Sequence, residues 1–167
     1  MKKFFPILIG FVLAVVVVSL GLKPWERRVY QPIAYNHRVH VENVGLSCTG
    51  CHEFAEQREA AGIPNQEFCM NCHEEKVSEN PETDKIRQYA KKGEAIPWRR
   101  ITYIPKHVYF SHRRHVAFGK IDCTTCHGKM GERESPPTRP LIPIRMETCI
   151  SCHQQRGVNT DCLTCHR

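Results

Sequence analysis

Regular hydrophobic patterns are scarce in this sequence of 167 residues once its first 22 residues are set aside. Residues 101–104 (ITYI) form the one strand-like segment, and an extended spacer would have the same pattern. Residues 53–61 and 82–92 predict short polar helices, but neither has a strong apolar face. Prolines punctuate much of the remainder. The chain therefore lacks the patterns from which a packed interior of sheets or amphipathic helices is built.

Clusters of basic residues are also missing, although 24 Lys and Arg stand against 17 Asp and Glu and give a formal charge of +7. The basic residues are scattered and accompany no nucleic-acid-binding motif, so nucleic acid is not an expected partner. We interpret the surplus as a solvated basic face that favours solubility. The same surplus would balance the charge of acidic cofactors, if the chain binds any.

One long hydrophobic run stands at the N-terminus, where residues 4–22 are apolar and uncharged over 19 residues. This length matches a membrane-spanning helix, and Trp25 suits the membrane interface. The run lacks the A-x-A-like end of a cleaved signal peptide, so we expect a retained single-pass anchor, with cleavage as the alternative. Residues 1–22 are thus predicted to form a cytosolic N-terminus and anchor, and residues 23–167 a domain on the periplasmic side of a bacterial inner membrane.

Every cysteine of the chain belongs to a C-x-x-C-H motif, the signature of covalent haem c attachment. Two thioether bonds would fix the porphyrin edge, and the adjacent histidine would ligate the iron. Zinc ribbons and redox dithiols also use C-x-x-C pairs, but neither requires a histidine after every second cysteine. Haem attachment takes place outside the cytoplasm, which sets the orientation of the anchor. The predicted attachment residues are Cys48, Cys51, Cys69, Cys72, Cys123, Cys126, Cys149, Cys152, Cys162 and Cys165, with His52, His73, His127, His153 and His166 as proximal ligands.

Five further histidines match the number of predicted haems. This match predicts bis-histidine ligation, which favours low potentials and leaves no open iron position for a substrate. Electron transfer is therefore expected rather than catalysis. Met130 or Met146 remains an alternative ligand for one iron. The predicted distal ligands are His37, His40, His107, His112 and His115.

Residues 32–52 and 107–127 align without a gap at an offset of 75, with eight of 21 positions identical. Each copy is followed by a second motif, so the chain is interpreted as two two-haem units, 32–73 and 107–153, with a fifth haem at 162–166. His107 stands where the first unit has Pro32, and we expect it to serve the additional iron. The predicted fold is mostly irregular with some helix, and porphyrins fill its core.

The aromatic-x-H-x-x-H segments, each followed by C-x-x-C-H, resemble the class III cytochromes c. The resemblance implies that His37 pairs with His52 and that His112 pairs with His127. It also implies that the second histidine of each H-x-x-H reaches a different haem. For His40 and His115 these haems would be those of His73 and His153, respectively.

Most of the chain after residue 30 more closely resembles the membrane-anchored pentahaem cytochrome subunit of alternative complex III, through QPIAYNHRVHVENVGLSCTGCH, FCMNCH and IPWRRITYIPKHVYFSHRRHVAFGKIDCTTCHG. The resemblance implies a non-catalytic subunit of a quinol-oxidising respiratory complex. Its partners would be iron–sulfur or molybdopterin-like subunits, polytopic quinone-binding subunits, and a periplasmic cytochrome or copper protein. A related subunit of a quinone-reductase complex carries six haems, one more than the motifs here. A self-sufficient quinol dehydrogenase and a free-standing anchored carrier are the alternatives.

Overall fold

A computed structural model describes residues 10–14 and 28–166. Residues 10–14 are helical. No helix within the two described ranges is both long enough and apolar enough to cross a membrane. The predicted anchor at 4–22 lies outside the described residues apart from that short turn, so it stays a prediction.

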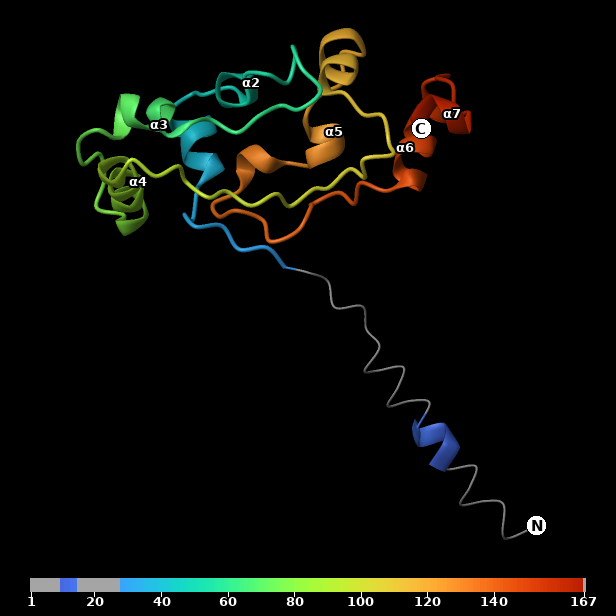
Figure 1. Ribbon diagram of the computed structural model, residues 1–167, viewed down its shortest axis with the longest axis horizontal. Helices are drawn as coiled ribbons and strands as arrows, with labels where there is room; N and C mark the ends of the chain where they lie inside the picture. Colours follow the sequence, from blue (N-terminus) through green and yellow to red (C-terminus); the bar gives the residue numbers. More distant parts are fainter. Residues whose placement is uncertain (1–9, 15–27, 167) are drawn as a thin grey trace.

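Short helices and irregular segments make up the haem-motif domain, and the described ranges contain no sheet. A single isolated bridge pairs Val108 with His166. Figure 1 shows α3 and α4 at one end of the molecule, α6 and α7 at the other, and α2 and α5 between them. In chain order the elements are η1 (Val39–Asn43), α2 (Cys48–Cys51), α3 (Gln66–His73), α4 (Pro81–Lys92), η2 (Arg114–Phe118), α5 (Thr124–His127), η3 (Met130–Glu132), α6 (Met146–Gln155) and α7 (Cys162–Cys165).

The predicted helix at 82–92 is present as α4, one residue longer at its start. Asn80 caps the helix by accepting a hydrogen bond from the Glu82 amide at 3.0 Å. Pro81 suits the first helical position, and Gly93 ends the helix with a left-handed φ of 66°. The sequence signals at both ends thus agree with the structure.

The predicted helix at 53–61 was wrong, because this segment forms turns and bends. The carbonyls of Arg58 and Glu59 accept the backbone amides of Arg113 and His112, both at 3.0 Å. A helix would have directed these carbonyls along its own axis. A contact with a distant part of the chain has therefore replaced the local structure. Residues 101–104 form no strand and join α4 to the second repeat as an extended connection.

Few side chains are buried in the described part of the chain. Ile33, Ile86 and Ile96 form one small apolar cluster beside α3 and α4, and Met70 and Trp98 pack against it. No polar or charged residue there is fully buried. A cluster of three isoleucines is small for a chain of this size, which agrees with an interior completed by cofactors.

Candidate haem-binding sites

The ten cysteines lie on or beside five short helical segments. We number the sites along the chain: site 1 is 48–52, site 2 is 69–73, site 3 is 123–127, site 4 is 149–153 and site 5 is 162–166. Residues i, i+3 and i+4 of a helical turn share one face, so each turn presents two thiols and a histidine together. None of the ten cysteines forms a disulfide, and all are exposed or half-buried. Their sulfurs are therefore free to form thioether bonds.

Local hydrogen bonds explain why these turns form. The Ser47 hydroxyl accepts the Gly50 amide at 3.0 Å and caps site 1. Asn65 caps the helix of site 2 by accepting the Phe68 amide at 2.9 Å. Asp122 accepts the Thr124 amide at 2.8 Å at the start of site 3. Side-chain acceptors before a turn satisfy amides that have no partner within the helix.

Four of the five motif histidines lie ring to ring with a histidine from outside the motifs. An iron between two imidazoles, with bonds of about 2.0 Å and about 1.1 Å from nitrogen to ring centre, sets the ring centres about 6.2 Å apart. His37 and His52 form one pair by proximity, since His52 contributes to the lowered pKa of His37. In the other four pairs the ring centres lie 6.2 Å apart for His40 and His73, 6.2 Å for His112 and His127, 6.1 Å for His115 and His153, and 5.6 Å for His107 and His166.

The orientation of five of the ten histidine rings is fixed through Nδ1. Nδ1 of His52 donates to the Gly62 carbonyl at 2.7 Å, and Nδ1 of His112 donates to the Glu59 carbonyl at 2.8 Å. His40, His115 and His153 make the same kind of bond to backbone carbonyls. A carbonyl oxygen can only accept, so Nδ1 carries the proton and Nε2 keeps its lone pair. This tautomer is the one that binds a metal through Nε2.

Burial also keeps several rings neutral, the form that ligates iron. Desolvation, followed by the proximity of His52 and His40, lowers the pKa of His37 to about 4. Desolvation, followed by His40 and Arg87, lowers the pKa of His73. Desolvation is likewise the main cause of a lowered pKa at His127, with a smaller contribution from His112. The residues present therefore fit haem groups with two axial histidines.

The methionines considered as alternative ligands lie elsewhere. Met146 begins α6 and is 58% exposed, and Met130 begins η3. Four of the five spare histidines lie against the ring of a different motif histidine instead, and His37 lies near His52. The structure brings together three of the pairs that the class III resemblance implies, His40 with His73, His112 with His127 and His115 with His153. It also places His107 beside His166.

Two groups that shape these sites were not singled out by the sequence reasoning. The carbonyls of Glu59 and Gly62 orient the rings of His112 and His52, and a backbone acceptor leaves little trace in a sequence. The aromatic residues Tyr35 and Phe110 each lie between two ligand rings. Their equivalence at the offset of 75 was visible in the sequence, but their position between ligands was not.

Comparison with known proteins agrees with this arrangement. The family described as cytochrome c7 and related cytochrome c matches residues 33–92 and again residues 108–167, two stretches displaced by the same 75 residues as the repeat. The multihaem cytochrome c subunit of menaquinone reductase from Nitratidesulfovibrio vulgaris is 28% identical over 190 residues, covering 97% of this chain and 89% of that protein. With family matches over most of its length, this mostly irregular chain belongs to the cytochrome c7 and related cytochrome c family.

Proposed function

We propose that the chain is an electron-transfer subunit that holds five covalently bound haem c groups. The observation that carries the proposal is the ring-to-ring approach of four motif histidines to four separate spare histidines, with His37 near the fifth, His52. The motif cysteines would form the thioether bonds, and each histidine pair would supply both axial ligands. Haem iron, when bound, supplies one-electron chemistry between its ferric and ferrous states. With both axial positions taken by protein, no site remains for a substrate.

The subunit is proposed to work within a quinone-linked membrane complex. The relative from Nitratidesulfovibrio vulgaris carries the name of a menaquinone reductase subunit and covers almost the whole chain. By this likeness, iron–sulfur or molybdopterin-like subunits and polytopic quinone-binding subunits are the proposed partners. The run at 4–22 would tether the haem domain on the periplasmic side of the membrane.

Two directions of electron flow are candidates. The relative's name favours delivery of electrons to menaquinone. The count of five motifs, and the segments that resemble the subunit of alternative complex III, favour quinol oxidation with a periplasmic cytochrome or copper protein as acceptor. Both directions require the same haem-binding residues, so they differ only in partners and potentials.

Purification from native membranes through a C-terminal tag tests the proposal. We expect five haems per chain, and co-purification of polytopic and iron–sulfur subunits. Fewer than five haems, or high-spin iron in the native protein, would contradict the closed sites. A lone cytochrome that oxidised quinol unaided would instead indicate a self-sufficient dehydrogenase. Within the complex, haem reduction by added menaquinol supports the quinol-oxidising direction, whereas oxidation of prereduced haem by menaquinone supports the reductase direction.

A further inference from the structure

Within each unit, an aromatic ring joins two neighbouring sites. The ring of Tyr35 lies 4.7 Å from that of His37, the distal histidine of site 1, and 4.4 Å from that of His40, the distal histidine of site 2. In the second unit, Phe110 lies 4.9 Å from His112 of site 3 and 4.8 Å from His115 of site 4. Sites 1 and 2 are therefore neighbours, and so are sites 3 and 4.

Reciprocal backbone bonds join the two units. The amide of Arg113 donates to the carbonyl of Arg58 at 3.0 Å, and the amide of Arg38 donates to the carbonyl of Arg133 at 3.0 Å. Adding 75 to the numbers of the pair 38 and 58 gives the pair 113 and 133, so each unit makes the same bond to the other. This exchange is the pattern of an isologous, two-fold interface, here formed within one chain.

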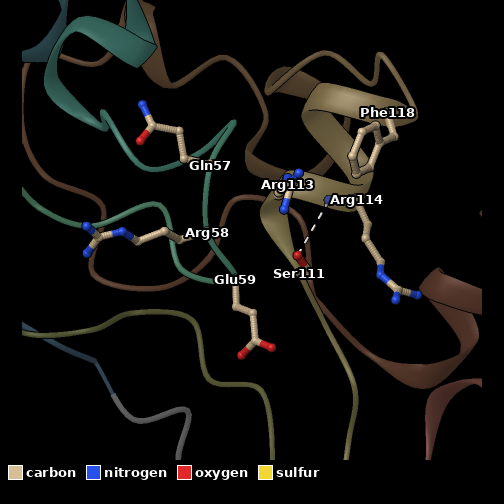
Figure 2. Close-up of a pocket in the computed structure, with 7 residues that line it drawn as sticks. All are labelled: Gln57, Arg58, Glu59, Ser111, Arg113, Arg114 and Phe118. Atoms are coloured by element: carbon tan, nitrogen blue, oxygen red, sulfur yellow. Dashed lines mark hydrogen bonds between the residues drawn. The ribbon is translucent and has the colours of Figure 1, made fainter.

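Sites 1 and 3 meet at this interface. Cys48 and Cys123 are equivalent by the same offset and lie near each other. The Glu59 carbonyl, in the segment that follows site 1, accepts both the amide and Nδ1 of His112, the distal histidine of site 3, at 3.0 and 2.8 Å. Burial first, and then the nearby Cys48 thiol, raise the pKa of Cys123. Figure 2 shows the crossing of the two units, where Arg58 and Glu59 line a surface hollow of about 330 Å³ together with Arg113. A two-fold relation that places sites 1 and 3 together at the axis places sites 2 and 4 on opposite outer sides.

Site 5 extends the row beyond site 4. The amide of Tyr109 donates to the Cys165 carbonyl at 2.8 Å, which ties site 5 to the start of the second unit. Nδ1 of His153 in site 4 donates to the Asn159 carbonyl at 3.3 Å, and the Asn159 side chain accepts the amide of Asp161, which precedes α7, at 2.8 Å, so site 5 lies beside site 4. In Figure 1, α6 and α7 lie together at the end opposite α3.

We infer that the five haem sites form one unbranched row in the order 2, 1, 3, 4, 5, which is not their order along the chain. The inference rests on the proposed function and adds to it the two termini of the electron path. Site 2, on α3 beside α4, is one terminus, and site 5, on α7, is the other. Every electron that crosses the molecule must pass the junction between sites 1 and 3, where Cys48 and Cys123 meet.

Iron positions from anomalous scattering in crystals of the haem-loaded chain test the order directly. We expect the iron of site 1 between those of sites 2 and 3. The inference would be overturned if the iron of site 2 lay closer to the iron of site 3 than the iron of site 1 does. The haem count of the same crystals separates this outcome from failure of the proposed function, because five irons in another order refute only the row.

A matched pair of variants tests the order in solution. His107→Gly opens the iron of site 5 to carbon monoxide, which binds the ferrous form while the other four haems are kept oxidised. A light flash then releases the carbon monoxide, and one electron passes from ferrous site 5 to a ferric acceptor. A second substitution, His37→Met or His40→Met, marks site 1 or site 2 by the absorption of a methionine-ligated ferric iron. Before the kinetics, each variant is checked for five haems and one methionine-ligated iron.

We expect the marked signal to decay several-fold faster in the variant with His37→Met than in the one with His40→Met. Equal rates, or a faster decay with His40→Met, would overturn the proposed order. In a row that follows the sequence order, an electron from site 5 would reach site 2 before site 1. If neither methionine ligates its iron, the crystallographic positions still decide between the two orders.

Discussion

Gly62 is the position where a single methyl group should disturb a haem site most selectively. Its φ is +78°, and a Cβ at this residue would lie 2.9 Å from Cδ2 of Phe54. The guanidinium of Arg58 lies 3.8 Å from the centre of the Phe54 ring, so a displaced ring would lose this cation–π contact. In Gly62→Ala the left-handed backbone costs about 1–2 kcal/mol. The steric conflict adds about 1–3 kcal/mol, as for other overpacked sites.

We therefore expect Gly62→Ala to lose about 2–5 kcal/mol of stability, which for a chain of this size lowers the melting temperature by about 5–15 °C. The assay is thermal unfolding of the haem-loaded protein, followed in the visible circular dichroism bands of haem. The Gly62 carbonyl also accepts the proton of His52 Nδ1 at 2.7 Å. A displaced carbonyl would change the basicity of this axial ligand, so one of the five midpoint potentials should shift.

Gly93→Ala is the matched control. Gly93 also has a positive φ, of 66°, but a Cβ there would meet nothing within 4 Å. Only the backbone cost of about 1–2 kcal/mol applies, and no haem potential should change. If the two variants lost equal stability and left all potentials unchanged, the assigned roles of the Phe54 contact and the His52 bond would be refuted.

Three further predictions concern α4 and the cofactors. Asn80→Ala removes the cap of α4 and should cost about 1 kcal/mol in chemical denaturation, with no change in haem content. The Ala34 amide first, and then Lys85, hold the pKa of the Glu82 carboxyl below its ordinary 4.5. The stabilisation that the ionised Glu82 carboxyl contributes is therefore present above pH 4.5 and is lost as the pH falls below it. Glu82→Gln should be less stable than the parent near neutral pH, and the difference should narrow in acid; a pH-independent difference would contradict this role. The haem-free chain should show no cooperative melt by far-ultraviolet circular dichroism, because its apolar cluster is small.

The sequence was most informative where chemistry is local. The helix predicted at 82–92 agrees with α4 to within one residue, and Asn80, Pro81 and Gly93 are ordinary helix boundary signals at its ends. Residues 53–61 were misjudged because the carbonyls of Arg58 and Glu59 bond to amides of the second repeat, a contact that helical periodicity cannot reveal. Tertiary contacts commonly override weak helical propensity in this way.

The histidine pairs show the same division. The sequence supplied the number of spare histidines and, through resemblance, four of the pairings. The approach of His107 to His166 brings together residues from opposite ends of the second half of the chain. The repeat led to the expectation that His107 serves the added motif, and the bridge at Val108 and the bond from Tyr109 to Cys165 are the backbone contacts that hold the two rings near each other.

The reciprocal bonds from Arg38 to Arg133 and from Arg113 to Arg58 bear on how the two ends of such a molecule come to differ. A single unit with these donors and acceptors could close the same bonds with a second copy of itself, but a homodimer necessarily has identical ends. Fusion of the two copies into one chain lifts that restriction. His107 and the fifth motif occur in only one copy, so the two extremities can diverge and each can suit a different neighbour.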